Sequence, residues 1–224
     1  MIYRKKYKPL IAIILLMIGM YSCQQKKANS KSTEYSNEKQ DTAVYKPKRA
    51  DTLSANDTTP SLDSLGSQVL RLLKNKDFQQ LTSVIHPALG LRFSPYGFID
   101  TAHQQRLSVS EIISLSQTNK KIVWGNFDGS GEPILLTIQG YFDRFVNDAD
   151  YLHAPKVSAD TTAETSNSIN NIITLYPQAH YIEYYFPGFN PKYSGMDWKA
   201  LRLVFSNYKN KPYLVAVVHA QWTI

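Results

Sequence analysis

The sequence predicts an α+β domain in which N-terminal helices pack on a curved antiparallel sheet. Two observations predict it. Apolar residues at helical spacing gather in the first part of residues 61–224, whereas short runs of β-branched and aromatic residues dominate the later part. Helices that precede a group of strands, instead of alternating with them, favour an α+β arrangement over a parallel α/β one. Residues 61–224 are therefore expected to form a single domain, long enough for one hydrophobic core.

The first helical pattern covers residues 62–85. Ser61 is expected to cap its N-terminus, because a serine hydroxyl accepts a hydrogen bond from the first turn. The polar run 75–77 is expected to divide the pattern into two helices, with Asp77 capping the second.

Two further helices are predicted downstream. The run from Ser108 to Glu111 has the spacing of a capping box and opens a short helix toward Leu115. Another helix is expected to begin after Thr137 and to continue through Val146.

Strand signals occupy most of the remaining domain. Residues 91–94 and 121–127 are rich in β-branched and aromatic side chains, and the glycines of residues 128–131 indicate a turn. The long polar stretch 147–168 is expected to be a surface excursion.

Four later segments are expected to form two strand pairs. Residues 172–176 and 181–186 are predicted to pair with each other, and residues 201–208 and 213–224 are predicted to form a C-terminal hairpin around the turn 209–212. Strict alternation in the last strand would place Tyr213, Val215, Val217, His219 and Gln221 on one face, and Leu214, Ala216, Val218, Ala220 and Trp222 on the other.

The N-terminal segment predicts export and lipid attachment. Residues 1–22 combine a basic start with the short apolar run 10–20, which is typical of a signal peptide and too short to span a bilayer. Cys23, the single cysteine of the chain, directly follows this segment, as in the cleavage motif of bacterial lipoproteins. An ordinary secretory peptide with an incidental Cys23 is the alternative interpretation. The polar, aliphatic-poor residues 24–60 are then expected to be a disordered tether behind the lipidated cysteine, so that the segment 23–60 holds the domain away from the membrane.

The net charge does not indicate a nucleic-acid partner. The chain carries a formal charge of +7, but four of the positive charges lie in the predicted signal peptide and two net positive charges lie in the tether. Residues 61–224 are left with a net charge of +1, which is too small for a phosphate-binding surface.

The ends of the domain resemble those of NTF2-like domains, which are cone-shaped. The similarity is carried by the opening pattern 69–78 with Leu81 and 85–87, and by the closing residues 219–222. The chain also resembles a family of uncharacterised bacterial lipoproteins and secreted proteins, through the motifs at 86–87, 91–96, 124–125, 128–131, 195–198, 201–205 and 221–224. The first resemblance implies an NTF2-like cone. The second implies export and assigns no activity.

A catalytic alternative follows from the same resemblance, because some NTF2-like domains are enzymes that use a histidine with an acid. His219 is the candidate here, with Arg202, Glu183 and Asp143 as possible neighbours. A lone histidine on a sheet is more often a hydrogen-bonded packing residue, and that interpretation stays open.

Aromatic residues give the other functional signal. Tyr185, Phe189, Tyr193 and Trp198 lie in or beside a loop rich in Gly and Pro, which favours a rim for a ligand or a partner. The structural alternative is that these rings build the core of a twisted sheet. Phosphate-binding loops, serine-hydrolase motifs and metal-ligand spacings are not found in the sequence, so neither a cofactor nor a metal is expected.

These observations favour an exported, lipid-anchored protein of the cell envelope, facing the periplasm or the cell surface. Its domain is expected to bind a small ligand or an envelope protein without catalysis. The alternative is an NTF2-like isomerase, dehydratase or hydrolase that uses a His/acid pair in its pocket.

Overall fold

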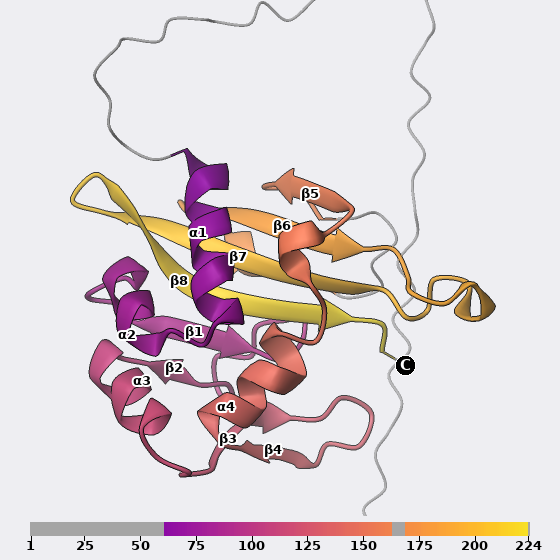
Figure 1. Ribbon diagram of the computed structural model, residues 1–224, viewed down its shortest axis with the longest axis horizontal. Helices are drawn as coiled ribbons and strands as arrows, with labels where there is room; N and C mark the ends of the chain where they lie inside the picture. Colours follow the sequence, from indigo (N-terminus) through magenta and orange to yellow (C-terminus); the bar gives the residue numbers. More distant parts are fainter. Residues whose placement is uncertain (1–60, 163–168, 224) are drawn as a thin grey trace, which may run out of the picture. The chain divides into compact units, whose positions relative to one another are not determined.

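The computed structural model describes residues 61–162 and 169–223, and these residues form a mixed α+β fold on a mostly antiparallel sheet (Figure 1). The α+β class predicted from the sequence is confirmed at this level. The predicted signal peptide 1–22, the lipidated Cys23 and the tether 24–60 lie outside the described residues.

The main sheet has six strands in the order β2-β1-β8-β7-β6-β5, and only the β1–β8 pair is parallel. A separate two-stranded sheet joins β3 and β4. The strands are β1 (Leu91–Ser94), β2 (Arg106–Leu107), β3 (Ile122–Asn126), β4 (Pro133–Leu136), β5 (Lys156–Ala159), β6 (His180–Phe186), β7 (Lys199–Tyr208) and β8 (Lys211–Gln221).

The helices begin where the capping residues predict. Ser61 caps α1, Asp77 caps α2, and the capping box between Ser108 and Glu111 opens α3. Thr137 caps α4, which continues into a π-helical turn. The helical segments are α1 (Leu62–Lys74), α2 (Phe78–Leu81), η1 (Thr82–Val84), α3 (Val109–Ser116), α4 (Ile138–Tyr141), η2 (Phe142–Val146), η3 (Tyr151–His153), α5 (Ile172–Leu175) and η4 (Pro191–Tyr193).

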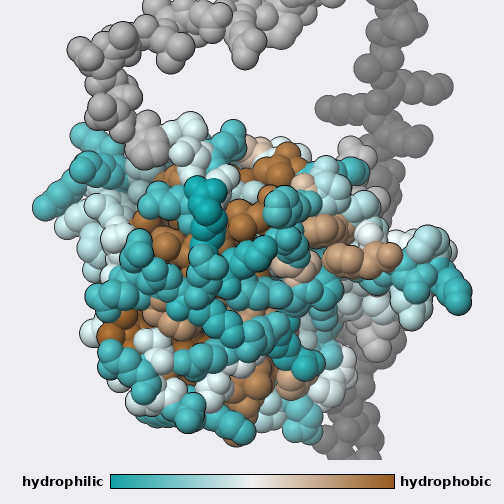
Figure 2. Space-filling view, viewed as in Figure 1, coloured by the Kyte–Doolittle hydropathy of each residue, from teal (hydrophilic) through white to brown (hydrophobic). Residues whose placement is uncertain are grey.

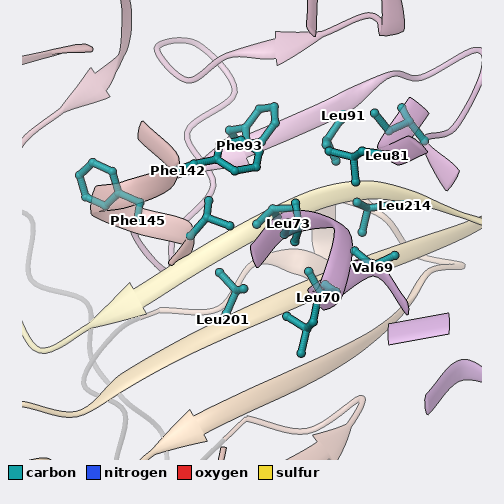
Figure 3. Close-up of a cluster of buried hydrophobic side chains, with 14 of the residues drawn as sticks. Val69, Leu70, Leu73, Leu81, Leu91, Phe93, Phe142, Phe145, Leu201 and Leu214 are labelled. Carbon is teal, nitrogen blue, oxygen red and sulfur yellow. The ribbon is translucent and has the colours of Figure 1, made fainter. Parts of the chain in front are cut away.

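Helix α1 packs on one face of the main sheet, which we call the α1 face. Gly66 allows the close approach, because a Cβ at this position would collide with the side chains of Ile182 and Tyr184 on β6. Figure 3 shows the helix over β7 and β8, with its apolar residues in one cluster with sheet residues that include Leu201 and Leu214. Viewed from this side, the surface is hydrophilic over much of its area, with hydrophobic patches between (Figure 2).

The C-terminal hairpin is confirmed, with a correction to its faces. Lys209 and Asn210 both have positive φ, which suits the two-residue turn between twisted strands. A bulge lies opposite Val204 and Phe205, where β8 has one additional residue, Val215. Leu214 therefore lies on the α1 face together with Val217, and not with Ala216 as strict alternation predicts.

Strand β8 is a central strand of the main sheet. It lies between β7 and β1, and it ends at Gln221. Trp222 follows the strand, and its ring packs on the cluster of Ala200 and Ala220, so it shares the face of Ala220 as expected. It is only partly buried there, and it is therefore not a central core residue.

One sequence prediction in the middle of the domain is wrong. Residues 172–175 form the one-turn helix α5 and not a strand paired with 181–186. Strand β6 pairs instead with β5, which lies inside the predicted surface excursion 147–168. That segment also contains η3.

The face of the sheet opposite α1 is the back face. Ala200, Arg202, Val218 and Ala220 belong to it, because they alternate with the α1-face residues along β7 and β8. Ile99 and Ile172 pack on part of it. Of the candidate functional residues, His219 lies on the α1 face, whereas Arg202 and Glu183 lie on the back face.

Candidate functional site

His219 lies on the α1 face, fully enclosed by protein, and both of its ring nitrogens contact acceptor atoms. Nδ1 is 2.8 Å from the carbonyl oxygen of Pro95, and Nε2 is 3.2 Å from Oδ2 of Asp148. The ring also packs edge-on against Phe145. The ring thus bridges the backbone of Pro95 and the carboxylate of Asp148.

Asp148 is the acid beside His219, and the sequence did not single it out. Its carboxylate also accepts a hydrogen bond from the Tyr151 hydroxyl at 2.8 Å and pairs with the ammonium of Lys199. Burial opposes ionisation of Asp148, but the hydrogen bonds from His219 and Lys199 prevail and hold its pKa well below the usual range. Burial, and then the charge of Asp148, raises the pKa of Tyr151 well above its ordinary value.

Arg202 and Glu183 form an ion pair inside the back face. Nε of Arg202 donates to Oε2 of Glu183 at 2.7 Å, and the two side chains are 0% and 1% exposed. They are cross-strand neighbours on β7 and β6. His219 is the cross-strand partner of Leu201 and shares the α1 face with it. The Arg202–Glu183 pair lies on the back face, so the structure does not bring it to His219.

Asp143, the third predicted neighbour of His219, is also elsewhere. It is exposed on η2 and pairs with Lys76 at the end of α1. Of the predicted catalytic candidates, only Arg202 and Glu183 contact each other. None of them is among the residues that line the two larger clefts described next.

The first cleft, which we call the aromatic cleft, has a volume of about 340 Å³ and opens on the back face. It lies where β5, β6 and the start of β7 approach the end of β8. Its walls are Lys156, Tyr185, Pro187, Ser194, Gly195, Met196, Trp198 and Trp222. Two of the four aromatic residues predicted for binding, Tyr185 and Trp198, thus line one cleft.

Trp198 gives this cleft an unusual polar feature. The residue is 2% exposed, and its indole Nε1 is buried without a hydrogen-bond partner among the described residues. A buried N–H that lacks an acceptor costs about 1–3 kcal/mol of stability. This buried, unpartnered donor lies in the wall beside the cleft, beneath its accessible surface.

The other two predicted aromatic residues do not line the aromatic cleft. Phe189 and Tyr193 are 51% and 53% exposed. Phe189 instead stacks on Phe186, with ring centroids 5.1 Å apart. The sequence pattern did not distinguish the exposed rings of this loop from those that line the cleft, and it did not select Trp222 as a lining residue.

The second cleft, the Asp100 cleft, has a volume of about 430 Å³. Oδ2 of Asp100 is 2.6 Å from Nδ1 of His103, and this hydrogen bond is the main cause of the lowered pKa of Asp100. Both residues are partly or largely exposed. The lining residues are Tyr96, Gly97, Phe98, Asp100, His103, Gln104, Gly125, Asn126, Phe127, Asp128, Ile169 and Thr223.

Neither cleft assembles a metal site: in residues 61–162 and 169–223, no group of three or more His, Cys, Asp or Glu side chains is placed to hold a metal ion. Over the same ranges, no helix has the length and apolar character that crossing a membrane requires. No protein-family model matches this chain, and no curated protein matches its sequence.

Proposed function

We propose that this protein is a lipid-anchored protein of the cell envelope whose α+β domain binds a small ligand or a partner protein without catalysing a reaction. The aromatic cleft is the binding site. The observation that carries the proposal is the cleft itself, in which Met196, Lys156 and the partly buried Trp222 surround the buried rings of Tyr185 and Trp198. A concave, mostly apolar site with few polar groups is the usual form of a small-molecule pocket.

The proposal places the membrane anchor at Cys23. It is supported by the basic and apolar segment before this cysteine, by the absence of a second thiol in the sequence, and by the polar residues 24–60. Two or three acyl chains on one cysteine give stable retention on a membrane. The domain then faces the periplasm or the cell surface.

We also propose that the fold is an NTF2-like cone, as in the lipoprotein family that the sequence resembles. The proposal is supported by α1 on one face of the sheet and by the long β7–β8 hairpin. An experimental structure tests it, because the cone requires the main sheet to curve around α1. A flat sheet would contradict it.

A ligand screen tests the binding function. Saturation-transfer NMR with the full-length chain and a mixture of small metabolites is expected to detect compounds that bind the wild type but not Trp198→Phe. Tyr193→Ala is the matched control, because this ring lies in the same loop but outside the cleft. Compounds that bind wild type and Trp198→Phe equally well would contradict the aromatic cleft as the site.

The alternative enzymatic function has one specific observation in its favour, the Asp100–His103 pair on the larger cleft. A carboxylate that holds Nδ1 of a histidine leaves Nε2 for proton transfer. The isomerase, dehydratase or hydrolase alternative would therefore use His103 and Asp100, because His219 lines neither cleft. Hydrolysis of p-nitrophenyl esters that disappears in His103→Ala would support this alternative, and equal rates in the two proteins would contradict it.

A further inference from the structure

The Asp100 cleft is lined by side chains that solvent reaches. Phe98 and Ile169 are 51% and 71% exposed, and the side chains of Asp100 and His103 are 38% and 65% exposed. Asp128 is exposed as well. The volume of about 430 Å³ falls within the range of roughly 300–1,000 Å³ that is typical of small-molecule sites. A ligand in this cleft can therefore contact both apolar and polar side chains directly.

Two carboxylates give the Asp100 cleft a negative charge. Asp100 and Asp128 line it, and no lysine or arginine does so among the described residues. The hydrogen bond with His103 is the main cause of the lowered pKa of Asp100, so this carboxylate is ionised at neutral pH. Arg144 is not a lining residue, but its guanidinium carbon lies 4.8 Å from the centroid of the Phe127 ring. With one guanidinium beside two carboxylates, the charge stays negative while His103 is neutral.

Apolar side chains add a second preference to this charge. A cation is attracted to the face of an aromatic ring within about 6 Å of its centroid, and Phe98 presents a half-exposed ring. Ile169 offers an aliphatic surface among the same lining residues. A hydrated metal ion gains little from such groups, and the described residues place no three His, Cys, Asp or Glu side chains to hold one. The lining therefore favours an ammonium group that is attached to an apolar body.

From the charge, the exposed ring and the volume we infer that the Asp100 cleft binds a small organic ammonium compound. The ammonium group faces Asp100 and Asp128, and the apolar body contacts Phe98 and Ile169. Primary amines and quaternary ammonium compounds share this chemistry. The Asp100 cleft and the aromatic cleft have no lining residue in common, so the inference does not depend on the proposed function.

Saturation-transfer NMR with the full-length chain tests the preference for a cation. The probes share a phenylethyl group: 2-phenylethylamine and its trimethylammonium derivative are cations, 2-phenylethanol is neutral, and 3-phenylpropionate is an anion. Saturable binding in the millimolar range is expected for a cation, because each contact at an exposed site is weak. The alcohol is expected to bind about threefold more weakly or less, and the anion more weakly still. Comparison of the two cations distinguishes a primary amine from a quaternary one.

Four variants assign the binding to this cleft. Asp100→Asn and Asp128→Asn are each expected to weaken the cations about two- to fivefold, as for an exposed ion pair, and to leave the alcohol unchanged. Phe98→Ala is expected to weaken the cations by a similar factor through loss of the ring. Asp143→Asn is the matched control, because it removes an exposed carboxylate that does not line the cleft. Thermal melting curves show which variants are folded, and Asp128→Asn, at an exposed turn, carries the test if Asp100→Asn is not.

Three outcomes would overturn the inference. The ligand class is wrong if neither cation shows saturable binding at millimolar concentrations, or if the alcohol or the anion binds as tightly as the cations. The site is wrong if Asp143→Asn weakens the cations as much as Asp100→Asn and Asp128→Asn do, since that result would indicate general attraction to surface carboxylates. Trp198→Phe, which tests the aromatic cleft, should leave the binding of the cations unchanged, so the two sites can fail separately.

Discussion

His219 and Asp148, which are 71 residues apart in the sequence, meet through Nε2 and Oδ2 at 3.2 Å on the α1 face of the sheet. This contact links β8 to the segment that follows η2. Lys199 and Tyr151 contact the same carboxylate, so one buried acid holds three elements together. Neither His219 nor Asp148 lines either cleft, so we expect their contact to stabilise the fold. The first two predictions test this.

The stability contributed by Asp148 is expected to depend on pH. Its native-state pKa is depressed below the unfolded value of about 3.9, so the contribution is complete above that value and is lost as pH falls through the native pKa. Urea unfolding at a series of pH values should show Asp148→Asn about 3 kcal/mol less stable than wild type at pH 7. This difference should shrink below about pH 4. Asp143→Asn, at an exposed pair, is the control and should stay within about 0.5 kcal/mol of wild type.

His219→Ala is expected to reduce stability by about 3 kcal/mol, because it leaves the buried carboxylate of Asp148 without one of its partners. Ligand binding in the NMR screen of the aromatic cleft should be unchanged, since His219 lies on the opposite face of the sheet. A folded His219→Ala protein that no longer binds the compounds found in the screen would contradict this separation and would favour a functional role for His219.

The Arg202–Glu183 pair provides a test of buried charge. Arg202→Met alone leaves a buried carboxylate without its cation and is expected to cost about 3–5 kcal/mol. Adding Glu183→Leu removes that charge and should recover most of the loss, because an apolar pair avoids the desolvation of both ions. Urea unfolding of the single and double variants measures the recovery. A double variant that is less stable than Arg202→Met would show that the ion pair is not the source of the cost.

Trp222→Ala is expected to cost about 1–2 kcal/mol, because the ring is only partly buried beside Ala220 and the aromatic cleft. A fully buried tryptophan would cost about 3–5 kcal/mol. For a chain of this size, the expected cost corresponds to a decrease of roughly 2–8 °C in the melting temperature. A protein that fails to fold would place Trp222 in the core after all.

Cys23→Ala is expected to release the protein from membranes, since the acyl chains on this residue are the proposed anchor. Fractionation and incorporation of labelled palmitate are the measurements. Cys23→Ala protein that still sediments fully with membranes and still incorporates the label would show that the anchor lies elsewhere in the chain.

The helix starts and the hairpin turn were predictable because their causes are local. A capping side chain contacts backbone only three residues away. In α3, the Ser108 hydroxyl accepts a hydrogen bond from the N–H of Glu111, and the Glu111 carboxylate accepts one from the N–H of Ser108. Lys209 and Asn210 similarly form a turn from two consecutive residues. The partners of such contacts lie within a few residues of each other, so the contacts can be predicted from one sequence.

Helix α5 shows where local signals fail. Its apolar, β-branched residues are typical of a strand, but the side chain of Asn170 accepts a hydrogen bond from the N–H of Ile172 and supports the helical turn. Asn171 bonds through its side chain to both backbone groups of Ile99, 72 residues away. These contacts hold Ile172 against the back face, so tertiary packing overrides the strand propensity.

The sequence by itself determined the α+β class, the positions of most elements and the concentration of aromatic rings near Trp198. Only the tertiary structure decided which side chains meet. The bulge at Val215 transferred Leu214 to the α1 face, the fold of residues 147–159 brought Asp148 to His219, and the end of β8 carried Trp222 to Trp198. The physical reason is that each of these contacts joins residues that are distant in the chain. Such contacts depend on how the strands pair, and one additional residue in a strand changes which side chains share a face.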